Sequence, residues 1–214
     1  SEGVLTLGPV SSGVSADGTS FTLDNTSGVQ LNVGRDSSIG SLAGGGSNGG
    51  NVSIDSGRSL TVGALNTDTT FSGELVGAGN LRKTGSGKLT LSGSNSFTGE
   101  TVLENGSVVV ASPDALSNSS AIDVQSGSTL DLGQLENGFT VGSGQELGGT
   151  GSITGGINFA DGSIIAPGAS PGTLTFDSFV NFNPNSILNF ELNGSDTTVG
   201  GGINDLMTGI TDLT

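Results

Sequence analysis

The chain has 214 residues, of which 12% are charged and 40 are glycine, and it has a net charge of −15 with no cysteine and no histidine. These features exclude a disulfide framework, a Cys/His zinc site and a Ser-His catalytic triad, and the negative charge disfavours binding to nucleic acid or anionic lipid. An ordinary globular domain has about 25% charged residues and about 7% glycine, so the composition requires a structural explanation.

Short clusters of alternating apolar residues run along the chain. In chain order they are Phe21–Leu23, Leu31–Val33, Val52–Ile54, Leu60–Val62, Leu89–Leu91, Val108–Val110, Ile122–Val124, Leu130–Leu132 and Leu174–Phe176. Alternation places the apolar members on one face of a strand, and the regular supply of large aliphatic residues is not typical of disorder. No segment has a helical apolar stripe, and Ser112 to Leu116 are predicted to form at most one helical turn. The glycines also lack the period of three that collagen needs.

The clusters recur at a nearly constant interval. A separation of 21 positions relates Leu31 to Val52, Ile54 to Leu75, Leu60 to Leu81, Leu81 to Val102, Leu89 to Val110, and Ile153 to Leu174. A period between 20 and 50 residues indicates a solenoid or a propeller, but a propeller blade needs about 40 residues. A 21-residue coil instead accommodates three short strands. We therefore predict a three-sided parallel β-helix of roughly ten coils that stack at ~4.8 Å per coil.

The segments between the predicted strands have the composition of corners. Gly or Asn occurs in each of the segments 77–80, 84–87, 92–95, 104–107 and 125–128. These residue types adopt a positive φ at little cost, which a sharp change of chain direction requires.

Residues 71–110 resemble the passenger-associated β-strand repeat of bacterial autotransporters. The pattern G-x-L-x-K-T-G-x-G-x-L-T-L-S-G-x-N-x-F-T-G occupies residues 79–99. Residues 60–73 look like the lead-in to this repeat and residues 28–42 like an earlier copy. Three later stretches, 149–155, 165–176 and 188–194, are similar to the sequence that commonly follows it. The resemblance implies a right-handed parallel β-helix that is exported across the cell envelope.

We expect a single β-solenoid domain over residues 1–214. Residues 1–27 are predicted to form an N-terminal coil or cap, residues 28–194 the repeat coils, and residues 195–214 a C-terminal cap or truncated coil. No run of 18 apolar residues occurs, so this segment is not expected to insert into a membrane. The first residues lack the features of a signal peptide, and we expect the export signal and any anchor to lie outside this chain.

Two carboxylates and one serine are the candidate catalytic residues. Asp123 and Asp131 lie on neighbouring predicted strands, and paired carboxylates support glycoside hydrolysis on some β-helices. Each lies between apolar neighbours, so outward, solvated positions are expected instead. Ser170 lies in the segment 165–172, whose two Pro-Gly pairs suit type II turns, and the chain has no histidine to activate it. We therefore predict no catalytic residues and no enzymatic activity.

The basic residues and one glycine-rich segment are the candidates for binding anionic groups or a metal ion. Arg82, Lys83 and Lys88 make up most of the five basic residues, too few for the lyase chemistry that some β-helices perform, and we expect them to be solvated or to bridge coils. Residues 44–53 are distantly similar to a glycine-rich calcium loop but lack its aspartate. A flexible loop between coils is expected there. The sequence predicts no metal site and no cofactor, and leaves incidental calcium binding open.

Two functions fit these features. The first is a secreted or cell-surface stalk of an adhesive passenger, whose partners are surface glycans or proteins. The second is a subunit of an extracellular filament or sheath, in which copies stack through strand edges. Residues 1–20 and 195–214, if they cover the ends, favour the monomeric stalk. A segment such as Val180 to Leu192, donated to a neighbour, favours the filament.

Overall fold

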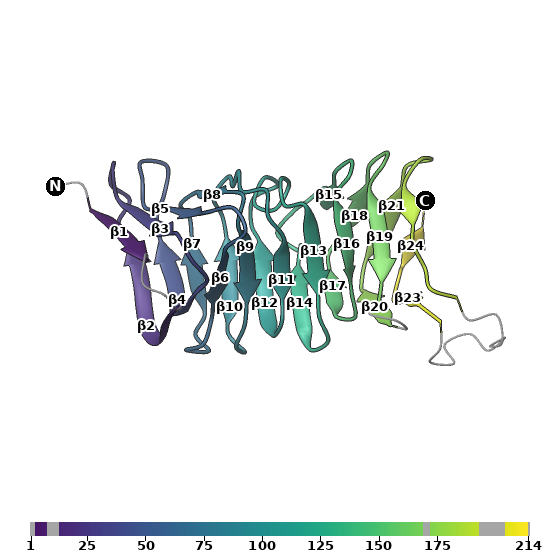
Figure 1. The fold of residues 1–214 in the computed structure, drawn as a ribbon. Helices are drawn as coiled ribbons and strands as arrows, with labels where there is room; N and C mark the ends of the chain where they lie inside the picture. Colours follow the sequence, from purple (N-terminus) through teal and green to yellow (C-terminus); the bar gives the residue numbers. More distant parts are fainter. Residues whose placement is uncertain (1–2, 8–12, 169–171, 193–203, 214) are drawn as a thin grey trace.

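The chain folds into a parallel β-solenoid. The computed structural model describes residues 3–7, 13–168, 172–192 and 204–213, and these form about 8 turns of ~22 residues with no helix. Figure 1 shows the coils stacked into a rod, with β1 (Val4–Leu7) at one end and β24 (Asp212–Leu213) at the other. The predicted all-β solenoid is confirmed. The turns are fewer than the roughly ten expected, and the longest intervals between paired residues are 26 residues from β1 to β3 and 33 residues from β20 to β23.

The coils have three faces, here called A, B and C, and most coils contribute a strand to each. Face A holds β1, β3 (Gln30–Val33), β5 (Asn51–Ile54) and β8 (Leu75–Gly77), then β15 (Phe139–Val141), β18 (Ile157–Phe159), β21 (Phe179–Phe182) and β24. Face B holds β6 (Ser59–Val62), β9 (Asn80–Lys83), β11 (Thr101–Leu103), β13 (Ala121–Val124), β16 (Glu146–Gly149), β19 (Ile164–Pro167) and β22 (Ile187–Leu188). Face C holds β7 (Thr69–Phe71), β10 (Lys88–Leu91), β12 (Gly106–Val110), β14 (Ser128–Asp131), β17 (Ser152–Thr154), β20 (Thr173–Phe176) and β23 (Leu206–Thr208).

Faces B and C meet in two long strands near the start of the rod. β2 (Val14–Leu23) and β4 (Ser37–Gly44) each run round the corner, so that the first half of each strand lies on face B and the second half on face C. Their mutual register shifts between Ala16 and Ser20, at the corner. The two faces thereby form one continuous 16-stranded sheet.

The strand pairs are parallel, but their register is less uniform than the sequence predicts. Leu31 pairs with Val52 and Leu60 with Leu81, as expected. Other partners are Val52 with Leu75, Leu81 with Thr101, Leu89 with Val108, and Ile153 with Phe176, at intervals of 23, 20, 19 and 23 residues. Because corner loops differ in length, the interval between partners varies around the mean.

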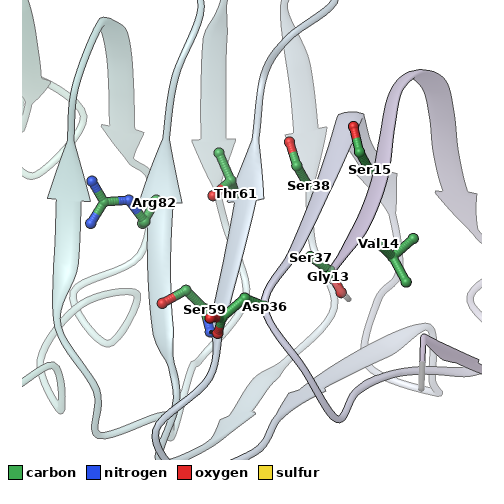
Figure 2. Close-up of a pocket in the computed structure, with 9 residues that line it drawn as sticks. All are labelled: Gly13, Val14, Ser15, Asp36, Ser37, Ser38, Ser59, Thr61 and Arg82. Atoms are coloured by element: carbon green, nitrogen blue, oxygen red, sulfur yellow. Dashed lines mark hydrogen bonds between the residues drawn. The ribbon is translucent and has the colours of Figure 1, made fainter. Parts of the chain in front are cut away.

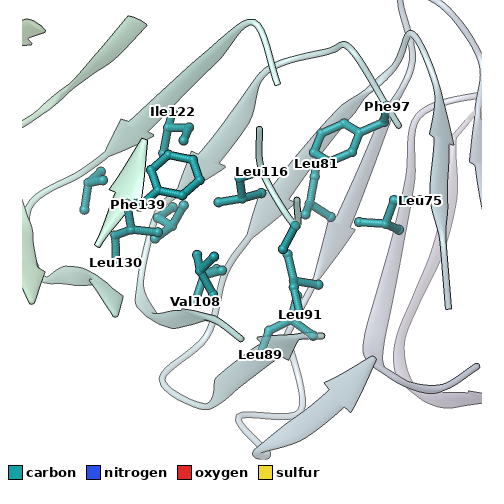
Figure 3. Close-up of a cluster of buried hydrophobic side chains, with 14 of the residues drawn as sticks. Leu75, Leu81, Leu89, Leu91, Phe97, Val108, Leu116, Ile122, Leu130 and Phe139 are labelled. Atoms are coloured by element: carbon teal, nitrogen blue, oxygen red, sulfur yellow. The ribbon is translucent and has the colours of Figure 1, made fainter. Parts of the chain in front are cut away.

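The inward side chains form one apolar column along the rod axis. Figure 3 shows the central part, where leucine, isoleucine and valine of successive coils stack around Phe97 and Phe139. Both phenylalanines are almost completely buried. Further along the rod, the rings of Phe159 and Phe182 stack with their centroids 4.9 Å apart. This column stabilises the fold mainly by removing apolar surface from water, which contributes ~25 cal/mol of free energy per Å² buried.

Face A has no strand in two central coils. Residues 95–98 and 111–120 cross this face as extended chain and turns, so the helical turn considered for Ser112 to Leu116 is absent. Asn95 replaces part of the missing ladder. Its Oδ1 accepts a hydrogen bond from the backbone N of Leu75 at 2.8 Å, and its Nδ2 donates one to the backbone O of Ala115 at 2.8 Å. One buried side chain thus connects three successive coils.

Candidate ligand-binding groove and coil-bridging contacts

A shallow groove of about 430 Å³ lies on face B near the start of the rod. It is lined by Gly13, Val14, Ser15, Asp36, Ser37, Ser38, Ser59, Thr61 and Arg82. Figure 2 shows that these residues come from neighbouring strands and that Arg82 lies on the opposite side of the group from Val14 and Ser15. The groove is therefore polar and crosses four consecutive coils.

One column of side chains forms the floor of the groove. Ser15 pairs with Ser38, Ser38 with Thr61, and Thr61 with Arg82, each in the parallel ladder between adjacent coils. The residues flanking Thr61 in β6, Leu60 and Val62, point inward and are buried. Because side chains alternate along a strand, the column points outward. Partners in neighbouring strands are about 4.8 Å apart, which sets the spacing of the three hydroxyls.

The carboxylate of Asp17 orients two of these hydroxyls. Its two oxygens accept hydrogen bonds from Ser38 Oγ and from Ser15 Oγ, the latter at 2.9 Å. The hydrogen bond from Ser38, followed by that from Ser15, lowers the pKa of Asp17 below its usual value, so the carboxylate is ionised at neutral pH. With their protons directed to Asp17, both serine oxygens keep lone pairs for an incoming donor.

The remaining groups give the groove both donors and acceptors. Asp36 Oδ1 accepts a hydrogen bond from the backbone N of Ser59 at 3.0 Å. Within the described part of the chain, Ser59 Oγ and Thr61 Oγ1 have no hydrogen-bond partner. Arg82 pairs with Glu104 through one guanidinium nitrogen, and the side chain is about one-third exposed. The arrangement can hydrogen-bond a polar ligand from several sides.

The sequence did not indicate this groove. Ser15, Ser38 and Thr61 are separated by 23 positions rather than by the period of 21, and the same residue types are abundant throughout the chain. Only the register of β2, β4, β6 and β9 brings them into one column. The sequence predicts that Arg82 is solvated or bridges coils, and its ion pair with Glu104 of the following coil agrees with the second alternative.

Lys83 was expected to be solvated or to bridge coils, and it is not solvated. It is 1% exposed, and its Nζ donates hydrogen bonds to the backbone oxygens of Thr84 at 2.6 Å, Gly85 at 2.8 Å and Asn105 at 3.3 Å. Burial lowers the pKa of the ammonium group, and the nearby carboxylate of Asp68 partly opposes this change. Because β9 alternates inward and outward residues, Lys83 follows Leu81 on the inward side. The bridge to Asn105 agrees with the alternative expectation of a coil-bridging role.

The two carboxylates weighed as a catalytic pair do not share a face. Asp123 lies in β13 on face B and pairs with Val102 and Gly148, whereas Asp131 lies in β14 on face C and pairs with Val109 and Thr154. Both are partly exposed between buried neighbours, in agreement with the outward positions predicted. Ser170 lies outside the described residues.

The glycine-rich segment 44–53 forms a tight turn that packs on the preceding coil. Gly46 and Gly49 exchange two backbone hydrogen bonds, at 3.0 and 3.3 Å, and Asn25 Oδ1 accepts one from the backbone N of Asn48 at 2.8 Å. The described residues contain no group of three or more Asp, Glu, His or Cys side chains placed to hold a metal ion. None of the described residues belongs to a helix that is long and apolar enough to cross a membrane.

The central coils match a known family of repeats. The family described as Passenger-associated-transport-repeat matches residues 81–110, which run from β9 to β12. This match covers 30 of the 214 residues. The chain is also 38% identical over 104 residues, or 47% of its length, to the adhesin BmaC autotransporter of Brucella suis biovar 1 (strain 1330). The matched part covers only 3% of the length of that adhesin, and no solved structure matches the chain.

The matched repeat contains several of the side-chain contacts that join coils. Lys83 and Asn95 both lie in it, and each hydrogen-bonds to the following coil. Phe97 fills the core beneath the strandless part of face A. In physical terms, the repeat is a coil whose polar residues satisfy the backbone of the coil stacked on it.

Proposed function

We propose that this chain is a non-catalytic, rod-shaped segment of an exported adhesive protein on the cell surface, with surface glycans or proteins as partners. The observation that carries the proposal is the 38% identity to part of an autotransporter adhesin, together with the passenger repeat. The net charge of −15 keeps such a rod soluble and disfavours nucleic acid as a partner. A stalk of this kind presents its faces, rather than a deep pocket, to its surroundings.

The test is an adhesion assay with the purified chain. Fluorescent beads coated with the chain are incubated with cultured epithelial cells, and bound beads are counted against beads that carry an unrelated acidic protein of similar size. Binding several-fold above this control supports an adhesive role. Binding at the level of the control overturns the adhesive role for this segment.

End-to-end assembly is a second candidate, because apolar side chains of the first and last described strands are exposed. Leu5 continues the buried row of Leu31 but is 49% exposed, and Leu213 continues the row of Val180 but is 62% exposed. The strands have the same direction in each coil, so the last edge of one copy has the geometry to pair with the first edge of the next. Apolar end surfaces add a driving force for this contact.

Neither of the two features expected to decide between these candidates does so. The described residues among 1–20 belong to β1 and β2, which pair with β3 and β4 as part of the stack. Val180 to Leu192 was considered as a donated strand, but β21 and β22 pair within their own chain. Negative-stain electron microscopy over a concentration series separates the candidates, because filaments that lengthen with concentration support assembly and short rods at every concentration contradict it.

A further inference from the structure

We propose that the face B groove binds a linear, neutral oligosaccharide along the rod axis. This inference rests on the proposed adhesive function and names the ligand class of that function. The groove volume of about 430 Å³ lies within the range of small-molecule sites. Its floor is the column Ser15, Ser38, Thr61 and Arg82, which spans three steps between coils, or about 14 Å.

The spacing of the column suits a chain of sugars. One step between coils is about 4.8 Å, close to the length of one pyranose unit in an extended glycan. A saccharide that lies along the column therefore meets one protein side chain per sugar. A peptide in extended form instead presents alternate side chains and unpaired backbone groups, and the groove borders no free strand edge in its central part, where β4 and β6 are paired on both sides.

The hydrogen-bonding groups match a ligand rich in hydroxyls. Ser15 and Ser38 direct their protons to Asp17, so their oxygens act as acceptors. Arg82 adds guanidinium N–H donors beyond the nitrogen that pairs with Glu104. Sugar hydroxyls donate and accept at once, so they can serve both kinds of group.

The charges select against acidic sugars. Asp17, Asp36 and Glu104 lie in or beside the groove, whereas Arg82 is the cation that lines it. The whole chain also has a net charge of −15, so a uronate or sulfated glycan is repelled at long range. No aromatic side chain of the described residues lines the groove, so binding rests on hydrogen bonds, and millimolar affinity per site is expected. Many copies on one surface raise the overall affinity for a multivalent glycan by avidity.

The test is an NMR titration of the ¹⁵N-labelled chain with cellohexaose and maltohexaose as neutral probes and hexagalacturonate as the acidic one. We expect a neutral probe to shift the amide signals of Ser38, Thr61 and Arg82, and hexagalacturonate to bind more weakly. Thr61→Val keeps the shape of the side chain and removes its hydroxyl. It is expected to weaken binding by about fivefold, the effect of one hydrogen bond.

Thr90→Val is the matched control, because Thr90 is a partly exposed threonine at the same point of a strand on face C. It should leave binding unchanged, and circular dichroism should show both variants folded. The proposal is overturned if neither neutral probe shifts the groove signals, if hexagalacturonate binds more tightly, or if both variants bind equally well. The bead assay is run in parallel with Thr61→Val, so that adhesion that persists without saccharide binding contradicts the groove proposal alone.

Discussion

The ammonium group of Lys83 donates a hydrogen bond to the backbone oxygen of Asn105, which lies in the following coil, at 3.3 Å. Two further carbonyl oxygens, those of Thr84 and Gly85, complete its surroundings. A buried charge is costly unless hydrogen bonds surround it, and here the three oxygens provide them. The cation thereby holds the corner between faces B and C to the next coil.

Replacing Lys83 by methionine should lower stability. Met has a similar length but leaves three backbone oxygens without this donor, and an unsatisfied buried polar group costs about 1–3 kcal/mol. We expect the free energy of unfolding to fall by about 2 kcal/mol, measured by urea unfolding followed by circular dichroism. Lys88→Met is the control, since Lys88 is exposed in β10, and a change within about 0.5 kcal/mol is expected there. Equal losses in the two variants would contradict the role of Lys83.

The contribution of Lys83 should also depend on pH. The pKa of Lys83 is lower in the folded chain than its usual value of 10.5. At a pH between the folded pKa and 10.5, the unfolded chain therefore binds more protons than the folded chain. Stability from this group is therefore complete above 10.5 and is lost as the pH falls through the folded pKa. We expect the melting temperature of the wild type, relative to that of Lys83→Met, to rise as the pH approaches 10.5. A difference that is constant or shrinks over this range would refute the prediction.

Gly77 tests the close approach of one coil to the next. Its φ is 99°, and a Cβ atom there would lie 2.1 Å from the backbone oxygen of Ile54 in the preceding coil. Gly127 has a similar φ of 83° but has open space around that position. Gly127→Ala should cost about 1 kcal/mol from backbone strain alone. Gly77→Ala should cost at least about 2 kcal/mol more, because the coils must separate. Similar losses at both positions in thermal unfolding would show that only φ matters.

Asn95 tests whether a side chain replaces the missing strand on face A. Asn95→Asp keeps the acceptor for Leu75 N but places a second oxygen against the carbonyl of Ala115. We expect a loss of about 3 kcal/mol or more, since a charge is then buried beside an acceptor. Asn137→Asp is the control at an exposed turn, where little change is expected. Amide hydrogen exchange should show loss of protection centred on residues 95–98, and uniform loss along the rod would contradict this local role.

The ion pair between Arg82 and Glu104 should contribute little. Both side chains are about one-third exposed, and pairs of this kind are worth about 0.2–1 kcal/mol. A double-mutant cycle with Arg82→Gln and Glu104→Gln should therefore give a coupling energy of at most about 1 kcal/mol, which 1 M salt reduces. A larger, salt-insensitive coupling energy would mean that the pair acts like a buried one.

Sequence periodicity predicted the architecture because it is a local property. Alternation in Leu60 to Val62 fixes which residues face inward, and Gly or Asn at the corners allows the chain to turn. The register was predicted less well. Leu81 pairs with Thr101 rather than Val102, and Leu89 with Val108 rather than Val110, because each corner has its own length. A mean period does not contain these differences.

The sequence by itself determined that this chain is a β-solenoid with an apolar column, no thiol or imidazole chemistry, and a passenger-type repeat. Only the tertiary structure decided which outward residues meet. The hydrogen bond from Lys83 to Asn105 and the column Ser38, Thr61 and Arg82 both depend on the register between coils. That register is set by loop lengths and by packing across the stack, which are non-local, whereas the inward or outward direction of each side chain is fixed within its own strand.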